Sequence, residues 1–156
     1  MLKSIEGNFD NHEVHELLTK HFIELRAASP EGSAHVLDIP GLKVPSIKFW
    51  SLWENDLLMG CGALKFLDKE HGEFKSIRVN DKFRNKKNGI KIIKHLINEA
   101  IKLNVKKLSL ETGAGEFFLP ARKLFINCGF KVCEPFSHYK EDINSVYMSL
   151  LIGNKS

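Results

Sequence analysis

Three basic side chains lie close together in the polar segment NDKFRNKKN, directly before a stretch whose apolar residues recur at helical spacing. They are Arg84, Lys86 and Lys87. The first turn of a helix leaves backbone N–H groups without partners and carries the positive end of the helix dipole. Such an end, reinforced by three cations, favours binding of a phosphate or pyrophosphate. A solvated basic loop ahead of a surface helix would give the same local pattern.

A carboxylate precedes this basic loop on a segment with strand character, EFKSIRV. This residue, Glu73, is a candidate general base that could take a proton directly or through a water molecule, most effectively when buried. Strand alternation places on one face Glu73, Lys75, Ile77 and Val79. An ammonium beside Glu73 would favour the charged carboxylate and weaken it as a base. A purely structural Glu73–Lys75 pair therefore remains an equal alternative.

Metal chemistry has little support in the sequence. HEVHE places His12 and Glu16 four residues apart on a helix, but it is not an HExxH motif and no third ligand is evident. The cysteines form no CxxC pair and are odd in number, which argues against a disulfide framework. They are Cys61, Cys128 and Cys133. We therefore expect no metal, and reduced thiols as in a cytoplasmic protein.

Length and composition indicate one globular domain over residues 1–156. Of these residues 43% are hydrophobic and 27% are charged, and the formal net charge is +4. No segment approaches the roughly 20 consecutive apolar residues of a membrane span, and MLKSIEGNFD lacks the apolar core of a signal peptide. We expect a cytoplasmic protein without a membrane partner. The mild positive charge allows phosphate-bearing ligands without requiring nucleic acid.

Three segments have apolar residues at helical spacing. The first follows a cap at Asp10 or Asn11, the second covers about 89–103, and the third, FFLPARKLFINC, ends at Gly129. Residues 30–46 are rich in Pro and Gly and predict an irregular connection with at most one helical turn. Strands are expected in MLKSIE, IKFWSLW, LLMGCGALKFL, EFKSIRV, KKLSLET, FKVCEPF and SVYMSLL. The order β-α-β-β-β-α-β-α-β-β predicts an α+β fold, a mixed sheet with helices on its faces.

Two of these segments resemble motifs of the GNAT family of N-acetyltransferases. FRNKKNGIKIIKHLINEA resembles the acetyl-CoA signature [Gln/Arg]-x-x-Gly-x-[Gly/Ala], with Arg84 first and Gly89 last. ARKLFINCGFKVCEPF resembles the family pattern A-x-x-L-[Tyr/Phe]-x-x-x-G-F. GCGALKFLD, GEFKSIR, LETG and YKEDINSVYM are similar to a subgroup of small bacterial members. The resemblance spans nearly the whole chain and implies the acyl-CoA N-acyltransferase fold, a central, mostly antiparallel mixed sheet flanked by helices.

The resemblance also implies a set of residues that bind acetyl-CoA. The strand before the loop contributes backbone groups of Ile77, Arg78 and Val79, with the N–H of Val79 or Arg78 stabilising the tetrahedral oxyanion. The pyrophosphate is implied to lie on the segment formed by Arg84, Asn85, Lys86, Lys87, Asn88, Gly89 and Ile90. Phe125 is implied to line the channel near the thioester sulfur. Glu73, eleven residues before Arg84, matches the catalytic glutamate of histone-acetylating members.

Two departures from the family pattern affect these expectations. Lys87 replaces the first glycine, where a Cβ could obstruct a phosphate and the ammonium could attract it. Phe125 replaces the tyrosine that many members use as the general acid. Tyr139 and Tyr147 lie in the C-terminal part, and Tyr139 is the favoured substitute. Otherwise the thiolate departs unassisted or takes a proton from the substrate ammonium.

We therefore expect an acetyl-CoA-dependent N-acetyltransferase that acts on a primary amine of a small or peptide acceptor by direct attack. The acceptor itself is not readable from the sequence, and a homodimer is compatible with it. A catalytically silent member that only binds CoA is the main alternative. A nucleic-acid-binding protein is a weaker one, in which phosphates would contact Arg84, Lys86, Lys87, Lys91 and Lys94.

Overall fold

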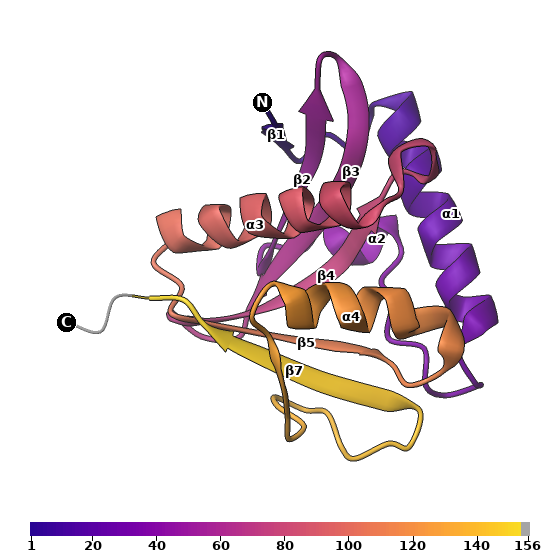
Figure 1. The fold of residues 1–156 in the computed structure, drawn as a ribbon, viewed down its shortest axis with the longest axis vertical. Helices are drawn as coiled ribbons and strands as arrows, with labels where there is room; N and C mark the ends of the chain where they lie inside the picture. The colour runs from indigo at the N-terminus through magenta and orange to yellow at the C-terminus, as the bar shows by residue number, and fades with distance from the viewer. Residues whose placement is uncertain (154–156) are drawn as a thin grey trace.

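A seven-stranded sheet with helices on both faces forms the computed structural model, which describes residues 1–153 (Figure 1). The strand order is β1-β2-β3-β4-β5-β7-β6, and β4 with β5 is the parallel pair among antiparallel neighbours. The strands are β1 Lys3–Glu6, β2 Ile47–Glu54, β3 Leu57–Phe66, β4 His71–Val79, β5 Lys107–Gly113, β6 Lys131–Cys133 and β7 Ser145–Leu151. The helices are α1 His12–Ala28, α2 Ile39–Leu42, α3 Lys86–Lys102 and α4 Leu119–Asn127, with 3-10 turns η1 Asp81–Phe83 and η2 Glu116–Phe118. The predicted mostly antiparallel α+β architecture is confirmed.

Helix α1 covers one face of the sheet. Asn11 caps it, because its side-chain oxygen accepts hydrogen bonds from the Glu13 and Val14 N–H groups. The apolar stripe of α1 packs into a core formed by Val14, Leu17, Leu18, Leu42, Phe49, Leu58, Cys61 and Ala63. The cap is therefore the second of the two predicted candidates, and the short helix α2 closes the same core within the segment predicted to be irregular.

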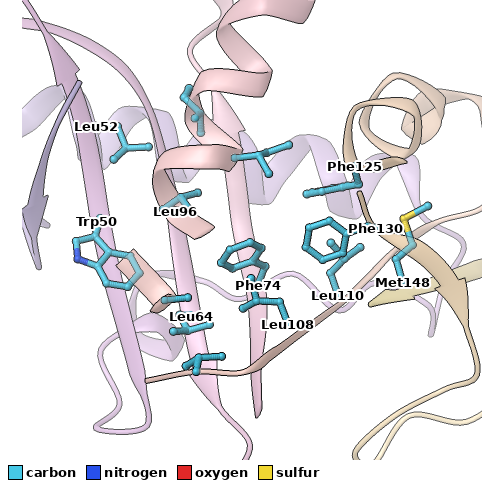
Figure 2. Close-up of a cluster of buried hydrophobic side chains, with 14 of the residues drawn as sticks. Trp50, Leu52, Leu64, Phe74, Leu96, Leu108, Leu110, Phe125, Phe130 and Met148 are labelled. Carbon is cyan, nitrogen blue, oxygen red and sulfur yellow. The ribbon is translucent and has the colours of Figure 1, made fainter. Parts of the chain in front are cut away.

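Helix α3 covers the opposite face and crosses in front of β2, β3 and β4 in Figure 1. It packs into the larger core, of which Figure 2 shows Trp50, Leu52, Leu64, Phe74, Leu96, Leu108, Leu110, Phe125, Phe130 and Met148. Asn85 is its cap, and the helix begins at Lys86, three residues before the predicted start at Gly89. The early start follows from the Asn85 side chain, which accepts the Asn88 N–H at 2.8 Å.

Strands β4 and β5 diverge from a common end, as Figure 1 shows. Their ladder covers three pairs, from His71 with Lys107 to Glu73 with Ser109. On its other side β4 carries a bulge, because two residues of β4 stand opposite Gly62 of β3. Ser76, in this bulge, has a φ of 54°, in the left-handed region. The bulge bends β4 and accompanies the opening of the sheet at its centre.

Candidate active site

The opening between β4 and β5 leads into a cavity of about 660 Å³. The wall toward α3 and α4 is apolar and includes Ile93, Leu110 and Phe125. The opposite wall carries polar residues from segments far apart in the sequence. They are His21 and Ser29 of α1 and its cap, Ser33 and His35 of the following connection, Glu73, Lys75 and Arg78 of β4, and Glu111 of β5. The cavity thus joins an apolar channel to a polar pocket through the gap in the sheet.

The bulge at Ser76 divides β4 between the two walls. Lys75 pairs with Ala63, which belongs to the core under α1, so Lys75 points toward that side. Ile77 and Val79, by contrast, pack against the core under α3. The sequence-based prediction that these residues share one face with Glu73 is therefore wrong, because an inserted residue reverses the alternation beyond the bulge.

The start of α3 forms one end of the cavity. Four backbone N–H groups at a helix start lack partners in the helix, here those of Asn85 to Asn88. The Asn85 side chain accepts the Asn88 N–H, and the Gly89 N–H donates to the Asn85 carbonyl at 3.0 Å. Ile90 lies one turn into the helix. The backbone N–H groups of residues 85–87 therefore have no acceptor within the helix or from its cap.

Some residues of the predicted phosphate loop line the cavity and others do not. Arg84 and Lys86 line the cavity, as does Asn85. Arg84 is more than half exposed and pairs with Asp81 at 2.8 Å. Lys87 is exposed and is not among the residues that line the cavity.

Two further residues of the predicted loop have structural contacts. The Asn88 side chain donates to the Phe83 carbonyl at 2.7 Å and holds the loop before α3. Gly89 is buried, and a Cβ built on it would come within 2.4 Å of the Leu124 side chain of α4. The last glycine of the motif therefore permits close packing of α3 against α4. It does not stand at the cavity.

The backbone of β4 presents one N–H to the gap. Asn80 donates its N–H to the Met59 carbonyl across the edge shared with β3. Since successive N–H groups along a strand point to opposite edges, the Val79 N–H points to the edge from which β5 has diverged. Val79 lines the cavity, whereas the Arg78 side chain is buried on the α1 side and pairs with Glu24 at 2.8 Å and Asp81 at 3.1 Å.

Glu73 stands at the centre of a compact polar group at the base of the gap. Its side chain is 1% exposed. Its Oε2 accepts hydrogen bonds from the Tyr139 hydroxyl at 2.5 Å and from Lys75 Nζ at 3.1 Å. Its Oε1 is buried and has no hydrogen-bond partner among residues 1–153. The Glu73–Lys75 contact predicted as an alternative is present, and it leaves one carboxylate oxygen bare at the cavity.

Tyr139 lies behind Glu73 and is not among the residues that line the cavity. Its hydroxyl also accepts a hydrogen bond from Lys75 Nζ at 3.2 Å. Burial, followed by the charge of Glu73, raises the pKa of Tyr139 above the ordinary value of a phenol. Tyr139 therefore stays protonated. Tyr147, the other tyrosine considered, donates its hydroxyl to the Lys140 carbonyl at 2.7 Å and anchors the segment that carries Tyr139.

Two residues of the polar wall were not singled out as catalytic candidates by the sequence. His35 contacts the edge of the Tyr139 ring at 5.2 Å. Glu111 accepts the Ser145 hydroxyl at 2.8 Å, and burial raises its pKa. An acidic residue at the carboxyl end of the strand parallel to β4 is the one signal that could have identified Glu111. His35 lies in an irregular segment, where nothing local indicates its contact.

No group of three metal-ligating side chains occurs within residues 1–153. The same residues contain no helix long and apolar enough to cross a membrane.

Comparison with known proteins places this site within a family. The model of the Acetyltransferase (GNAT) family matches residues 11–130. The uncharacterized N-acetyltransferase YsnE of Bacillus subtilis (strain 168) is 46% identical over 137 residues, which are 88% of this chain and 91% of that protein. The uncharacterized N-acetyltransferase YedL of Escherichia coli (strain K12) is 37% identical over 139 residues, 89% of this chain and 87% of that protein. The chain belongs to the GNAT family of acetyltransferases.

Solved structures agree in fold. A Bacillus subtilis acetyltransferase in complex with CoA is similar with a TM-score of 0.69 and 19% identity, over 97% of this chain and 99% of that one. Spermidine N-acetyltransferase from Vibrio cholerae, in complex with CoA and spermine, has a TM-score of 0.70 and 17% identity, over 97% of this chain and 95% of that one. The N-acetyltransferase PseH from Campylobacter jejuni, in complex with acetyl coenzyme A, has a TM-score of 0.68 and 18% identity, over 97% of this chain and 99% of that one. The predicted GNAT fold and enzyme class are confirmed.

Proposed function

We propose that this acetyltransferase moves the acetyl group of acetyl-CoA to a primary amine by direct attack in a ternary complex. The observation that carries the proposal is the buried, bare Oε1 of Glu73 at a cavity that joins an apolar channel to a polar pocket. A carboxylate oxygen without a partner at such a place can accept a proton from an incoming ammonium or amine. The complexes of similar folds with CoA or acetyl-CoA support the assignment of the donor.

In this proposal the channel between α3 and α4 holds the acyl-carrying arm of the donor, with Phe125 beside the thioester. The N–H groups of 85–87, together with the Arg84 and Lys86 side chains, receive the pyrophosphate. Lys87 is exposed and does not line the cavity, so we expect it to add positive charge near the phosphates without its Cβ obstructing them. The Val79 N–H is the donor that stabilises the oxyanion when the amine attacks the thioester carbon.

The proton path uses the group around Glu73. Glu73 takes the proton of the attacking amine as the C–N bond forms and the C–S bond breaks. Tyr139 then gives its phenolic proton to the departing thiolate and recovers one from Glu73 along their 2.5 Å hydrogen bond. Lys75 holds both oxygens in place. Since Tyr139 does not line the cavity, its side chain must move past Glu73 toward the sulfur for this step, and its raised pKa keeps it protonated until then.

A second candidate function is a member that binds CoA without catalysis. The observation that favours it is Phe125, which lines the cavity at the position of the usual tyrosine and has no proton to donate.

One experiment separates the two functions. Acetyl-CoA is titrated calorimetrically into the protein, and free thiol is then measured with a panel of primary amines, with each N-acetyl product identified by mass. We expect binding, and one acetylated amine for each thiol released. Binding without product from any amine would establish the silent module, and no binding at millimolar acetyl-CoA would exclude both. Thermal unfolding with an oligonucleotide serves as the control for phosphate binding in general.

A further inference from the structure

Unpartnered polar atoms gather around the cavity. Five buried side-chain atoms lack a hydrogen-bond partner among residues 1–153, and four belong to residues that line this cavity. These four are His21 Nδ1, Glu73 Oε1, Ser76 Oγ and Arg78 Nε. Buried polar groups are nearly always hydrogen-bonded, since an unmade bond costs more free energy than a made one contributes. Their concentration at one cavity indicates a ligand with complementary polar groups.

The chemistry of the four atoms sets what that ligand must offer. An ionised Glu73 only accepts hydrogen bonds, so it calls for an N–H donor. Arg78 Nε only donates, so it calls for an acceptor oxygen, and the Ser76 hydroxyl can donate to the same group. Glu73 and Arg78 lie five residues apart on β4, on the same side of the sheet. An amine toward one end and an oxygen toward the other satisfy both.

The surroundings of Arg78 favour an anionic oxygen over a neutral one. Arg78 pairs with two carboxylates, Glu24 and Asp81. These carboxylates also pair with two further cations, Lys20 and Arg84, so the group of five carries one positive charge in excess. His21, beside them, is neutral, because burial and then the charge of Arg78 lower its pKa to about 3. A carboxylate would supply the missing acceptor and neutralise the excess charge.

We propose that the acceptor of this enzyme is a free amino acid. Its carboxylate is received by Arg78 Nε and Ser76 Oγ next to His21, and its amine faces Glu73 directly or through one water. This inference rests on the proposed N-acetyl transfer and adds the acceptor class. A cavity of about 660 Å³ that also admits the acyl arm of the donor leaves room for a small molecule. A polyamine would leave Arg78 Nε unpaired and add cations beside it.

The test compares triplets of amines with one side chain: an amino acid, its amide, and the amine without the carboxyl group. Phenylalanine, phenylalaninamide and phenethylamine form one triplet; lysine, lysinamide and cadaverine form another. We expect kcat/KM for the amino acid to exceed that for the other two by about 10- to 100-fold, the loss typical of one charge-assisted hydrogen bond. If only the basicity of the amine mattered, the amide would be the best acceptor, because its amine is the least basic of the three and is the most deprotonated at neutral pH.

Variants then locate the preference. Arg78→Lys keeps the charge and removes Nε–H, and His21→Phe removes Nδ1 while keeping a planar ring. Each should reduce the ratio between amino acid and decarboxylated amine by about tenfold. His21→Asn, which restores a polar nitrogen near Nδ1, should recover part of it. Lys94→Gln is the matched control: it removes an exposed positive charge outside both the cluster and the cavity, and the ratio should stay near wild type.

The outcomes separate this inference from the proposed function. Transfer to amines with no preference for the carboxylate overturns the inference and leaves N-acetyl transfer standing. A preference that survives unchanged in both Arg78→Lys and His21→Phe, with acetyl-CoA affinity and melting temperature retained, also overturns it, because the carboxylate would then bind elsewhere. No transfer to any amine, with acetyl-CoA bound, refutes the proposed function itself.

Discussion

The two walls of the cavity differ in the kind of group that each contributes. The wall under α3 and α4 offers backbone N–H groups, from the end of β4 and the start of α3, and apolar side chains, from β4, α3, β5 and the η2–α4 segment. The wall under α1 offers side-chain groups with buried polar atoms, among them His21, Glu73 and Arg78. Backbone groups stay in place when side chains change. A single substitution should therefore affect the polar wall more than the backbone wall.

Contacts between distant segments hold the polar wall together. Ser33 donates its hydroxyl to Asp142 at 2.8 Å, which ties the connection after α1 to the segment between β6 and β7. Tyr139 of that segment then reaches Glu73, 66 positions earlier in the chain. The polar wall thus depends on contacts between distant segments, whereas the free N–H groups of the other wall come from one local stretch, the end of β4 and the start of α3.

The largest effect of a substitution on the polar wall is expected from Tyr139→Phe. If Tyr139 gives the thiolate its proton, turnover should fall by about two to four powers of ten. Phe125→Tyr in that background should restore part of the loss, since it places a phenol at the position usual in the family. Turnover is measured by thiol release at saturating acetyl-CoA. A rate equal to wild type would rule Tyr139 out and leave unassisted departure of the thiolate.

On the backbone wall, Arg84→Ala should weaken acetyl-CoA binding by about 10- to 100-fold, the effect of one lost charge-assisted hydrogen bond. Lys94→Ala is the control, because Lys94 is a basic residue of α3 that does not line the cavity. It should change the dissociation constant by less than about twofold, since surface charges are screened by salt. Equal losses in the two variants, measured calorimetrically, would mean a general charge effect and no specific phosphate contact.

Gly89→Val tests whether the motif glycine packs or binds. The new side chain meets Leu124, so we expect a loss of about 1–3 kcal/mol in the free energy of unfolding. Leu124→Ala in the same chain should relieve part of the loss by making room. Denaturant unfolding measures the first quantity, and titration of acetyl-CoA measures affinity. A variant of unchanged stability but strongly weakened binding would show that Gly89 contacts the ligand after all.

The buried His21 makes stability depend on pH. Its pKa in the folded protein, about 3, lies below its ordinary value of 6.5, so the unfolded chain binds a proton first as the pH falls. Stability is therefore lost below pH 6.5, by roughly 2 kcal/mol between pH 7 and pH 5. The free energy of unfolding of His21→Phe should therefore fall by roughly 2 kcal/mol less than that of the wild type between pH 7 and pH 5. Identical pH dependence in both proteins would mean that His21 is not held neutral.

The same division explains what could be predicted from the sequence. The basic loop that runs into a helix could be predicted, because Arg84 and the apolar stripe of α3 are local features, whereas the cap at Asn85 was missed and the helix start was placed three residues too late. The succession of strands and helices along the chain followed from periodicity for the same reason. The face of Ile77 and Val79 was predicted wrongly, since nothing in EFKSIRV announces a bulge at Ser76.

The polar wall could be predicted from the sequence only in part. Glu73 and Tyr139 were proposed separately, and their contact depends on how the segment between β6 and β7 folds back. The shared bond of Tyr139 and Lys75 to one oxygen of Glu73, which leaves the other bare, is a property of the packed structure alone. In the sequence, His21 has the spacing of a residue on the buried face of α1. Only its position at the cavity gives it a further role.

The most direct test of the central claim, that Glu73 takes the proton of the acceptor amine, is the pH–rate profile of Glu73→Gln. The amide keeps the shape of the side chain and removes the base. We expect turnover at neutral pH to fall by about two to four powers of ten, with acetyl-CoA affinity near wild type. The rate should also rise more steeply with pH, because reaction then requires an amine already deprotonated in solution. Wild-type turnover near neutral pH would contradict the claim and leave Glu73 as the structural partner of Lys75.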